Sequence, residues 1–227
     1  MTGVAVEVQH ASLRLGDATI LDDVTMDVGY GRLLALVGPN GAGKSSLLSL
    51  LTGDRAPTSG DVRLDGRRVS EWSARNLSRR RSVLLQSNQV AFSFTAGQVV
   101  AMGRTPWIGT EQAALDDARI AEAVERADVA HLLHRAYPSL SGGEKARVSL
   151  ARVLAQDTPV VLLDEPTAAL DLRHQEAVLG VARDLARDGC AVVVVLHDLS
   201  LAAAYADEVA MIDGGRLVAR GSALEVL

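Results

Sequence analysis

The chain has 227 residues and a formal net charge of −5 at pH 7, with 48% hydrophobic, 22% charged and only 3% aromatic residues. The hydrophobic share supports a sizeable core and excludes intrinsic disorder, and the length favours one domain. Acidic residues outnumber basic ones, 28 to 23, which argues against a duplex-binding protein, and so few aromatic rings cannot form a platform for single-stranded bases. We therefore expect no nucleic-acid partner.

Cysteine usage and hydropathy indicate the cellular compartment in which the protein functions. The single Cys190 cannot form an internal disulfide, and it opens an apolar run over residues 190–196 that predicts a buried strand. We expect a core thiol, which suits a reducing compartment. The N-terminus shows no leader pattern, and no apolar run approaches the roughly 20 residues that span a bilayer. These features predict a soluble protein.

The first part of the chain predicts strands, then a loop and a helix. Residues 4–8 and 12–15 alternate in polarity, as do residues 24–28 after a turn, which is typical of antiparallel strands. Residues 33–37 are continuously apolar, so we expect a strand buried on both faces. A glycine-rich loop and a helix over residues 45–52 follow.

The middle of the chain changes character. From about residue 92 to 135 it is rich in alanine and acidic residues, with apolar residues at helical spacing, which predicts a helical insert. Apolar strands resume at 160–163 and 191–196, separated by a helix near 173–187. Further strands are expected at residues 62–65, at 82–85 and in a hairpin over 208–219. This alternation predicts an α/β fold with a mostly parallel sheet.

Residues 38–45, Gly-Pro-Asn-Gly-Ala-Gly-Lys-Ser, match the phosphate-binding pattern G-x-x-x-x-G-K-[ST] between a predicted strand and helix. Glycines let backbone N–H groups converge on phosphate oxygens, and the helix N-terminus adds partial positive charge. Lys44 supplies a compact charge for the phosphates, and the Ser45 hydroxyl can bind Mg²⁺. The residues expected to bind ATP here are Gly38, Pro39, Asn40, Gly41, Ala42, Gly43, Lys44, Ser45 and Ser46.

The apolar run over residues 160–163 ends in two carboxylates, Asp164 and Glu165. Strand ends of parallel sheets face the ligand crevice, so Asp164 can hold Mg²⁺ and Glu165 can polarise an attacking water. Taken alone, two carboxylates could simply mark the exit of a strand into a turn. Together with the phosphate loop they favour a site that hydrolyses a nucleotide.

Residues 140–144, Leu-Ser-Gly-Gly-Glu, precede a predicted helix over residues 145–155. Ser141 and Glu144 have the spacing of a capping box, so the segment could serve only to begin the helix. A glycine-rich helix start is also a site for anions. On the residues alone, both interpretations stay open.

These motifs, followed by His197 and Asp198, stand in the order found in ABC-type ATPases, and residues 140–144 resemble the signature sequence of that family. The resemblance covers essentially the whole chain and implies the α/β fold of P-loop NTPases in a single domain. It places a RecA-like core with the N-terminal antiparallel β region at residues 1–88 and 156–227, and a helical subdomain that carries the signature at residues 89–155.

The resemblance also implies roles for three further residues. Gln86 is similar to the glutamine that reaches Mg²⁺ and water and senses the transporter, and His197 is similar to the switch histidine that contacts the γ-phosphate. Either residue could otherwise be a polar group that ends a strand. Asp171 lies in a segment similar to the loop that crosses the dimer interface of this family.

Subunits of this family pack head to tail, so the resemblance implies a homodimer. Each ATP would then lie between the phosphate loop of one subunit and Ser141, Gly142 and Gly143 of the other. ATP and Mg²⁺ are the expected ligands. A chain with a single ATPase unit resembles a separate transporter subunit, held by its permease on the cytoplasmic side of a bacterial inner membrane.

Residues 92–107 and 168–175 resemble the ATPases of importers for iron chelates, vitamin B12 and haem, most of all haem (hemin). The permease is expected to contact residues 86–107, and a substrate-binding protein takes part indirectly. Phe92, Phe94 and Trp107 could instead belong to the core of the helical insert. The alternatives are the ATPase of a siderophore or vitamin B12 importer, an exporter ATPase and a nucleic-acid-linked ABC ATPase.

Some residues depart from the family pattern or have no role in it. Leu15 stands where the family carries an aromatic residue that stacks on adenine, and Lys145 stands where glutamine often follows the signature. We expect residues 79–81, three arginines, to form a solvated strand entry, with a local basic patch as the alternative. His131 and His134 are expected to be surface residues without a metal.

Overall fold

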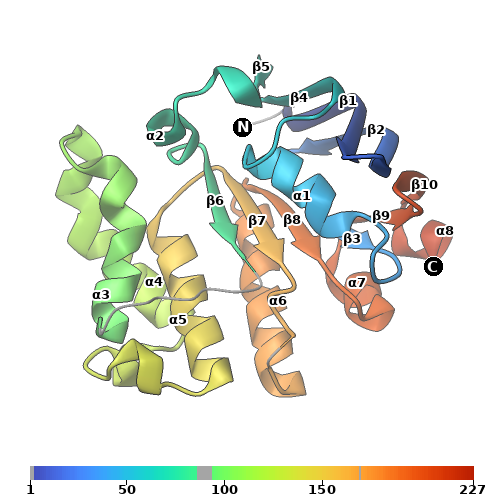
Figure 1. Cartoon of the computed structure of the whole chain (residues 1–227). Helices are drawn as coiled ribbons and strands as arrows, with labels where there is room; N and C mark the ends of the chain where they lie inside the picture. The colour runs from blue at the N-terminus through green and yellow to red at the C-terminus, as the bar shows by residue number, and fades with distance from the viewer. Residues whose placement is uncertain (1–2, 86–93, 169) are drawn as a thin grey trace.

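The computed structural model describes residues 3–85, 94–168 and 170–227. Within these residues the strands form two sheets, an antiparallel one in the order β2-β1-β4-β5 and a larger one in the order β10-β9-β3-β8-β7-β6. Figure 1 shows the antiparallel sheet beside α1 at one end of the molecule and the helices α3, α4 and α5 at the other end. The fold is the α/β class that the sequence predicts.

The antiparallel sheet comes from the alternating N-terminal segments, as expected. Its strands are β1 (Val4–Leu15), β2 (Ala18–Gly29), β4 (Ser59–Leu64) and β5 (Arg67–Arg68). β1 pairs with both β2 and β4, and irregularities in register bend it along its length. The leucines of α1 (Lys44–Thr52) share one hydrophobic core with this sheet and with one face of the larger sheet. α1 is therefore fixed from two sides.

The larger sheet is buried on both faces. Its strands are β3 (Arg32–Val37), β6 (Arg81–Leu84), β7 (Val160–Asp164), β8 (Ala191–Val195), β9 (Glu208–Asp213) and β10 (Arg216–Gly221). Leu34 and Leu36 pack in the core that contains α1, whereas Leu33 and Val37 pack in the core on the opposite face. Only β10 runs antiparallel, in the predicted hairpin with β9. Continuous apolar runs are typical of such two-sided burial.

The register of the parallel strands brings their carboxyl ends to one edge. Leu36 of β3 lies beside Val195 of β8, and Val195 lies beside Asp164 of β7. The chain segments that follow these three strands therefore leave the sheet together. This edge carries the phosphate loop, the acidic pair and His197.

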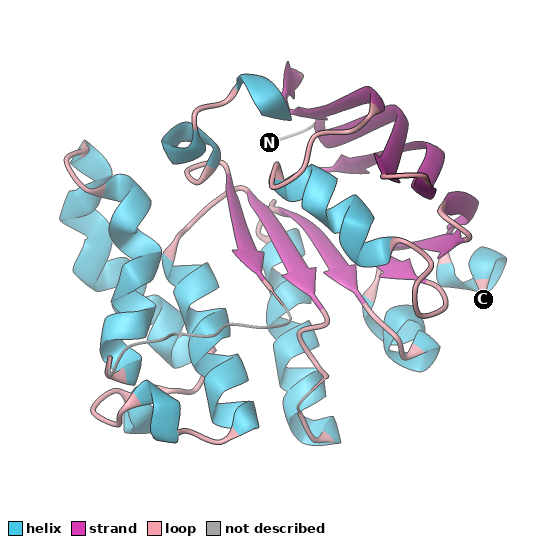
Figure 2. Ribbon diagram, in the orientation of Figure 1, coloured by secondary structure: helices cyan, strands magenta, loops and turns pink. Residues whose placement is uncertain are grey.

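Helices cover the remaining faces. α6 (Leu172–Arg187), α7 (Leu199–Tyr205) and α8 (Ala223–Val226) pack on the face opposite α1. The segments α2 (Ala74–Leu77) and the 3-10 helix η1 (Val69–Glu71) precede β6. Figure 2 shows helices gathered beside β6 and strands gathered on the other side of the molecule.

The predicted helical insert has its own core. Its elements are α3 (Ala96–Ala101), η2 (Met102–Trp107), η3 (Glu111–Leu115), α4 (Asp116–Arg126), η4 (Ala130–Leu132), η5 (Tyr137–Ser139) and α5 (Gly142–Ala155). Val124, Val129 and Leu132 are buried in this core, as their spacing predicts, whereas Leu115 is exposed. The insert is therefore a packed helical unit and not a single amphipathic helix.

Arg104 ties the insert together from inside. Its side chain is 3% exposed, and its guanidinium donates to Asp116 Oδ1 at 2.7 Å, to the Ala155 carbonyl at 2.9 Å and to the Gln112 carbonyl at 3.1 Å. Trp107 Nε1 donates to the Gln156 carbonyl at 2.7 Å. Trp107 is thus partly buried in the insert, and Phe94 packs against its core, while Phe92 lies outside the described residues.

The expectation that residues 79–81 form a solvated strand entry is wrong. Arg79 donates to the Pro106 carbonyl at 2.8 Å, Arg80 pairs with Asp65, and Arg81 donates to the last carbonyl of α1. Burial lowers the pKa of Arg81. These arginines link the strand entry to three other elements, because the guanidinium fork can reach several acceptors at once.

Cys190 lies one residue before β8 and is only partly buried, so the prediction of a strand position is wrong by one residue. Burial still raises the pKa of the thiol, which fits an unreactive side chain.

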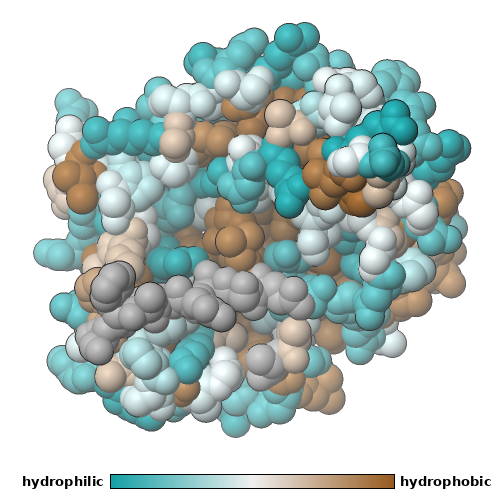
Figure 3. Space-filling view, in the orientation of Figure 1, coloured by the Kyte–Doolittle hydropathy of each residue, from teal (hydrophilic) through white to brown (hydrophobic). Residues whose placement is uncertain are grey.

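His131 and His134 are exposed, and no group of three or more metal-ligating side chains occurs among the described residues. In the same part of the chain, no helix is both long and apolar enough to cross a bilayer. Figure 3 shows hydrophobic side chains near the centre of the viewed face, within a hydrophilic surround.

Replacing Arg104 tests the importance of this buried guanidinium. Arg104→Ala leaves Asp116 and the Ala155 carbonyl without their donor, so we expect the free energy of unfolding to fall by about 3 kcal/mol. Urea unfolding followed by circular dichroism measures the change. The matched control is Arg119→Ala, whose half-exposed ion pairs with Glu122 and Asp157 should contribute about 1 kcal/mol or less. Equal losses in the two variants would contradict the special role of Arg104.

Candidate nucleotide-binding site

The loop between β3 and α1 is closely packed at its glycines. Gly38 has a φ of 141°, and a Cβ there would lie 1.9 Å from the Ile212 carbonyl oxygen. Gly43 has a φ of 105°, and a Cβ would lie 2.9 Å from the Leu21 side chain. Only glycine combines this backbone conformation with this space. Glycine at these two positions therefore lets the loop pack against Ile212 and Leu21.

Lys44 begins α1 and closes the loop. Its Nζ donates to the carbonyl oxygens of Gly38, at 2.7 Å, and Pro39, at 2.9 Å, and the residue is 5% exposed. Burial lowers the pKa of Lys44, and the charges of Glu165 and Asp164 partly offset this effect. The ammonium is thus held inside the loop, beside two carboxylates.

The other predicted residues of the loop lie around this ammonium. Gly41 has a φ of 77°, and the N–H of Ala42 donates to the Pro39 carbonyl at 3.2 Å. Asn40 lies in the same loop, and Ser45 and Ser46 lie in the first turn of α1. The structure therefore brings together all nine residues predicted for the phosphate loop.

Asp164 ends β7 directly opposite α1. Its Oδ1 accepts a hydrogen bond from Ser45 Oγ at 3.5 Å. Burial and the neighbouring charge of Glu165 raise the pKa of Asp164, while the contacts with Ser45, His197 and Lys44 act in the other direction. This is an oxygen-rich pair of ligands, of the kind that Mg²⁺ prefers.

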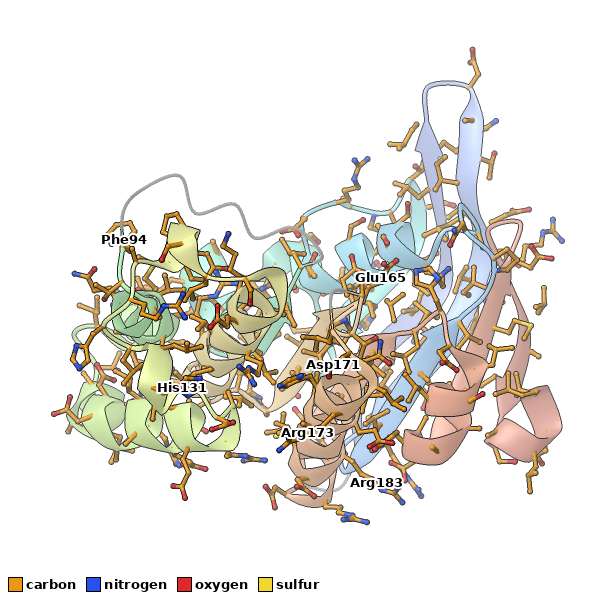
Figure 4. The ribbon with its side chains drawn as sticks, turned by 90° about the horizontal axis from the view of Figure 1, so that it is seen from below. Phe94, His131, Glu165, Asp171, Arg173 and Arg183 are labelled. Carbon is orange, nitrogen blue, oxygen red and sulfur yellow. The ribbon has the colours of Figure 1, made fainter. Side chains whose placement is uncertain are left out.

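Glu165 follows β7 with a φ of 48°, in the left-handed region that costs a non-glycine residue roughly 1 kcal/mol. Its Oε1 lies 2.5 Å from His197 Nε2, and its side chain is 13% exposed. Figure 4 shows Glu165 at the edge of the sheet, near the helix α1. His197 leaves the neighbouring strand β8 and fixes the orientation of the Glu165 carboxylate.

Ser141 and Asp171 both cap helices. Ser141 and Glu144 form the predicted capping box at the start of α5, and Glu144 pairs with Arg135 at 2.6 Å. Asp171 caps α6 and accepts hydrogen bonds from the His174 backbone N–H at 3.0 Å and from His174 Nδ1 at 2.7 Å. Hydrogen bonds lower the pKa of both carboxyl groups, those of Ser141 on Glu144 and those of His174 on Asp171.

One subunit does not assemble all the predicted site residues. In Figure 1 the start of α5 lies at the bottom of the view, apart from the loop that precedes α1, although Gly142 of this helix lines a pocket with Asp164 and Glu165. The phosphate loop, the acidic pair and His197 meet at the sheet edge instead. Gln86 lies outside the described residues.

The sequence did not reveal a pocket of about 210 Å³ next to the acidic pair. Asp164 and Glu165 line it on one side, and Gly142 and Lys145 of α5 line it on another. The one signal for it was the retention of a lysine at position 145 in a chain with only two lysines. Lys145 therefore lines the same pocket as the two carboxylates that lie beside Lys44. Leu15, at the end of β1, is 44% exposed.

A strand, a glycine-rich loop closed on a lysine, a helix and an acidic strand end opposite it define a P-loop NTPase. The sequence profile of the ABC transporter family matches residues 21–168. The chain belongs to this family and is one of its ATPases.

Individual proteins and solved structures also support the assignment to the ABC ATPases. The chain is 61% identical to the hemin import ATP-binding protein HmuV of Nocardia farcinica, over 92% of this chain and 72% of that protein. It is 54% identical to the protein of the same name from Thermobifida fusca, over 98% of this chain and 78% of that one. Among solved structures, the dimeric ATP-binding cassette MJ0796 bound to ADP and Pi superposes with a TM-score of 0.85 at 25% identity, over 96% of this chain and 98% of that one.

The raised pKa of Asp164 gives a prediction with a definite sign. At pH 7 this carboxyl is ionised in the unfolded chain, and keeping it ionised in the folded protein costs additional free energy. Asp164→Asn removes that cost, so the thermal unfolding midpoint without nucleotide should rise at pH 7. The gain should vanish well below the ordinary pKa of 3.8, where the carboxyl is neutral in both states. Differential scanning fluorimetry across this pH range measures it.

Asp171→Asn is the matched control for that experiment. Hydrogen bonds from His174 lower the pKa of Asp171, so its charge favours the folded state and its removal should not raise the midpoint. A rise at pH 7 with Asp171→Asn, or none with Asp164→Asn, would contradict the electrostatic account.

Proposed function

We propose that this chain is the ATP-hydrolysing subunit of a bacterial ABC importer for haem (hemin) or a related iron chelate. The observation that carries the chemistry is the convergence of Lys44, Asp164 and Glu165 at one sheet edge. The observation that supports the cargo is the identity of 61% and 54% to two proteins named hemin import ATP-binding protein. The alternative is the ATPase of a siderophore or vitamin B12 importer, and the reconstitution described below distinguishes it from a haem importer.

The loop residues 38–46 would bind the phosphates of ATP. Lys44 now donates to two loop carbonyls, and the β- and γ-phosphate oxygens would replace these as acceptors. Mg²⁺, when bound, neutralises phosphate charge, and Ser45 Oγ and Asp164 Oδ1 are two oxygen ligands that fit it. We propose Gln86 as a further ligand.

Glu165 would act on the attacking water. Its carboxylate takes a proton from the water while the water oxygen bonds to the γ-phosphorus and the bond to the ADP oxygen breaks. His197 holds Glu165 Oε1 at 2.5 Å before ATP binds, and its exposed position lets it contact the γ-phosphate afterwards. The backbone of Glu165 is strained, with a φ of 48°, as is common for residues at functional sites.

The separation of α5 from the phosphate loop supports a head-to-tail homodimer. Ser141, Gly142 and Gly143 form a helix start that can receive phosphate oxygens, and this start lies near Asp164 and Glu165 of its own subunit but apart from the loop that precedes α1. A second copy would supply them, with Asp171 at the contact between subunits. The dimeric form of the MJ0796 cassette supports dimerisation.

A groove of about 600 Å³ supports docking of the permease. Met102, Thr105 and Pro106 of η2 line it from the insert, opposite Arg75 of α2 and Arg152 of α5. The groove lies between the proposed RecA-like core, residues 1–88 and 156–227, and the proposed helical subdomain, residues 89–155. The permease would hold the subunit on the cytoplasmic side of the membrane, and a substrate-binding protein would deliver the cargo.

Two substitutions test the ATPase chemistry. Glu165→Gln should bind ATP and hydrolyse it at least about a hundredfold more slowly, because the amide cannot accept the water's proton. A closed dimer should then accumulate with ATP on gel filtration. Lys44→Ala should lose ATP binding, measured by equilibrium dialysis. Wild-type turnover in either variant would overturn the assigned role of that residue.

Reconstitution tests the cargo and the groove together. With its permease and a haem-loaded binding protein in liposomes, ATP turnover should rise; a rise with siderophore or cobalamin and none with haem would assign the chain to a sister importer. Thr105→Arg narrows the groove, so it should abolish this stimulation and leave the basal rate of the isolated subunit unchanged. Ala121→Arg, on the exposed face of α4, is the control that should behave as wild type.

A further inference from the structure

A second pocket, of about 210 Å³, lies between α4, α5 and α6, outside the nucleotide site. Arg126, Arg147, Arg173 and His174 line it, and Asp128 is the one carboxylate that the described residues contribute to its lining. We propose that this pocket binds a small organic anion, with a carboxylate or phosphate head and a short apolar body. In Figure 4, Arg173 lies at the start of α6, close to Asp171.

The arginines of this pocket have unused hydrogen-bond donors. Arg147 Nε is buried and has no hydrogen-bond partner among the described residues. Arg126 lies 3.7 Å from carboxylate oxygens of both Glu122 and Asp188, which is beyond hydrogen-bond distance. A buried N–H without a partner, such as that of Arg147 Nε, is costly, and an oxyanion could accept a charge-assisted hydrogen bond from it.

The rest of the lining is apolar, which favours a ligand with an apolar part attached to its anionic head. Leu150 of α5 and Val178 of α6 are buried core residues, and Val181 and Ala177 extend the same surface along α6. A fully hydrated inorganic ion would leave this surface unused. A short acyl or alkyl chain attached to the anionic head would cover it, and the cavity volume limits that chain to a few carbon atoms.

The pocket joins the two helices that carry the remaining predicted site residues. Arg147 lies in α5, four residues after Gly143, and Arg173 lies in α6, two residues after Asp171. An anion held by both arginines would fix the angle between these helices. If the proposed function is right, Gly143 and Asp171 face the partner subunit, so the anion would shift the ATP-dependent dimerisation. This consequence rests on the proposed function, whereas binding itself does not.

Titration with a matched pair of ligands tests the binding. Butyrate and butyl phosphate are added to the full chain saturated with ADP, which occupies the phosphate loop, and binding is followed by saturation-transfer NMR. Butyramide, the neutral analogue of butyrate, should bind at least about tenfold more weakly, because it lacks the charge that the arginines recognise. The tighter of the two anions identifies the head group. Equal binding of butyrate and butyramide would overturn the proposal.

Three variants place the binding in this pocket. Arg147→Gln and the exposed Arg173→Gln should each weaken binding of the preferred anion about tenfold. Arg187→Gln, on the same helix α6 but outside the pocket, should bind as wild type. Arg173 is exposed, so its replacement keeps the test decisive even if Arg147→Gln fails to fold. Unchanged binding in Arg173→Gln would overturn the proposal.

The two proposals fail in different ways. If the wild-type protein does not hydrolyse ATP, the proposed function is overturned. Anion binding can still be tested in that case, without ADP, by comparing wild-type protein with Arg173→Gln. Normal ATP hydrolysis with no selective binding of either anion would overturn the anion pocket alone. Faster or slower ATP-dependent dimerisation of Glu165→Gln with the anion supports both.

Discussion

Lys44 is a buried cation held by the carbonyl oxygens of Gly38 and Pro39, and the carboxylates of Asp164 and Glu165 are its compensating charges. A buried charge without compensation costs several kcal/mol, so the loop and the end of β7 must keep their relative positions. Parallel pairing of β3, β8 and β7 supplies this constraint, because register fixes where each strand ends. The register of the parallel strands therefore sets the position of the phosphate loop relative to Asp164 and Glu165 in the candidate site.

The same constraint explains why a single chain holds only part of the predicted site. Strand register fixes the positions of residues that follow neighbouring strands, such as Asp164 and His197. It does not fix the position of the start of α5, which follows no strand of this sheet. One side of that helix, with Val148 and Ala151, packs in the core of the insert, and another, with Leu150 and Val153, packs in the core beside the larger sheet. A site divided between a sheet edge and the start of a helix in the insert can be completed when two subunits associate, as the proposed dimer requires.

Local patterns predicted the parts of the fold that depend on neighbours in sequence. Apolar runs marked the buried strands, and the spacing of Ser141 and Glu144 marked a cap that the structure confirms. What could not be predicted depends on contacts between distant segments. Nothing near residues 79–81 indicates that Arg79 would reach the Pro106 carbonyl, and nothing near Trp107 indicates the Gln156 carbonyl as its acceptor. Burial of an arginine requires acceptors, and the sequence does not show which backbone groups will be left to accept.

The contrast between lysine and arginine follows from geometry. Arg104 serves three acceptors in different directions, a task that suits a planar guanidinium with five donors. Lys44 instead places one compact ammonium 2.7 Å and 2.9 Å from two carbonyls, where a guanidinium would be too wide. The chain's other lysine, Lys145, lines the pocket beside Asp164 and Glu165. One lysine thus supplies a charge beside the two carboxylates, and the other lines the pocket that they share.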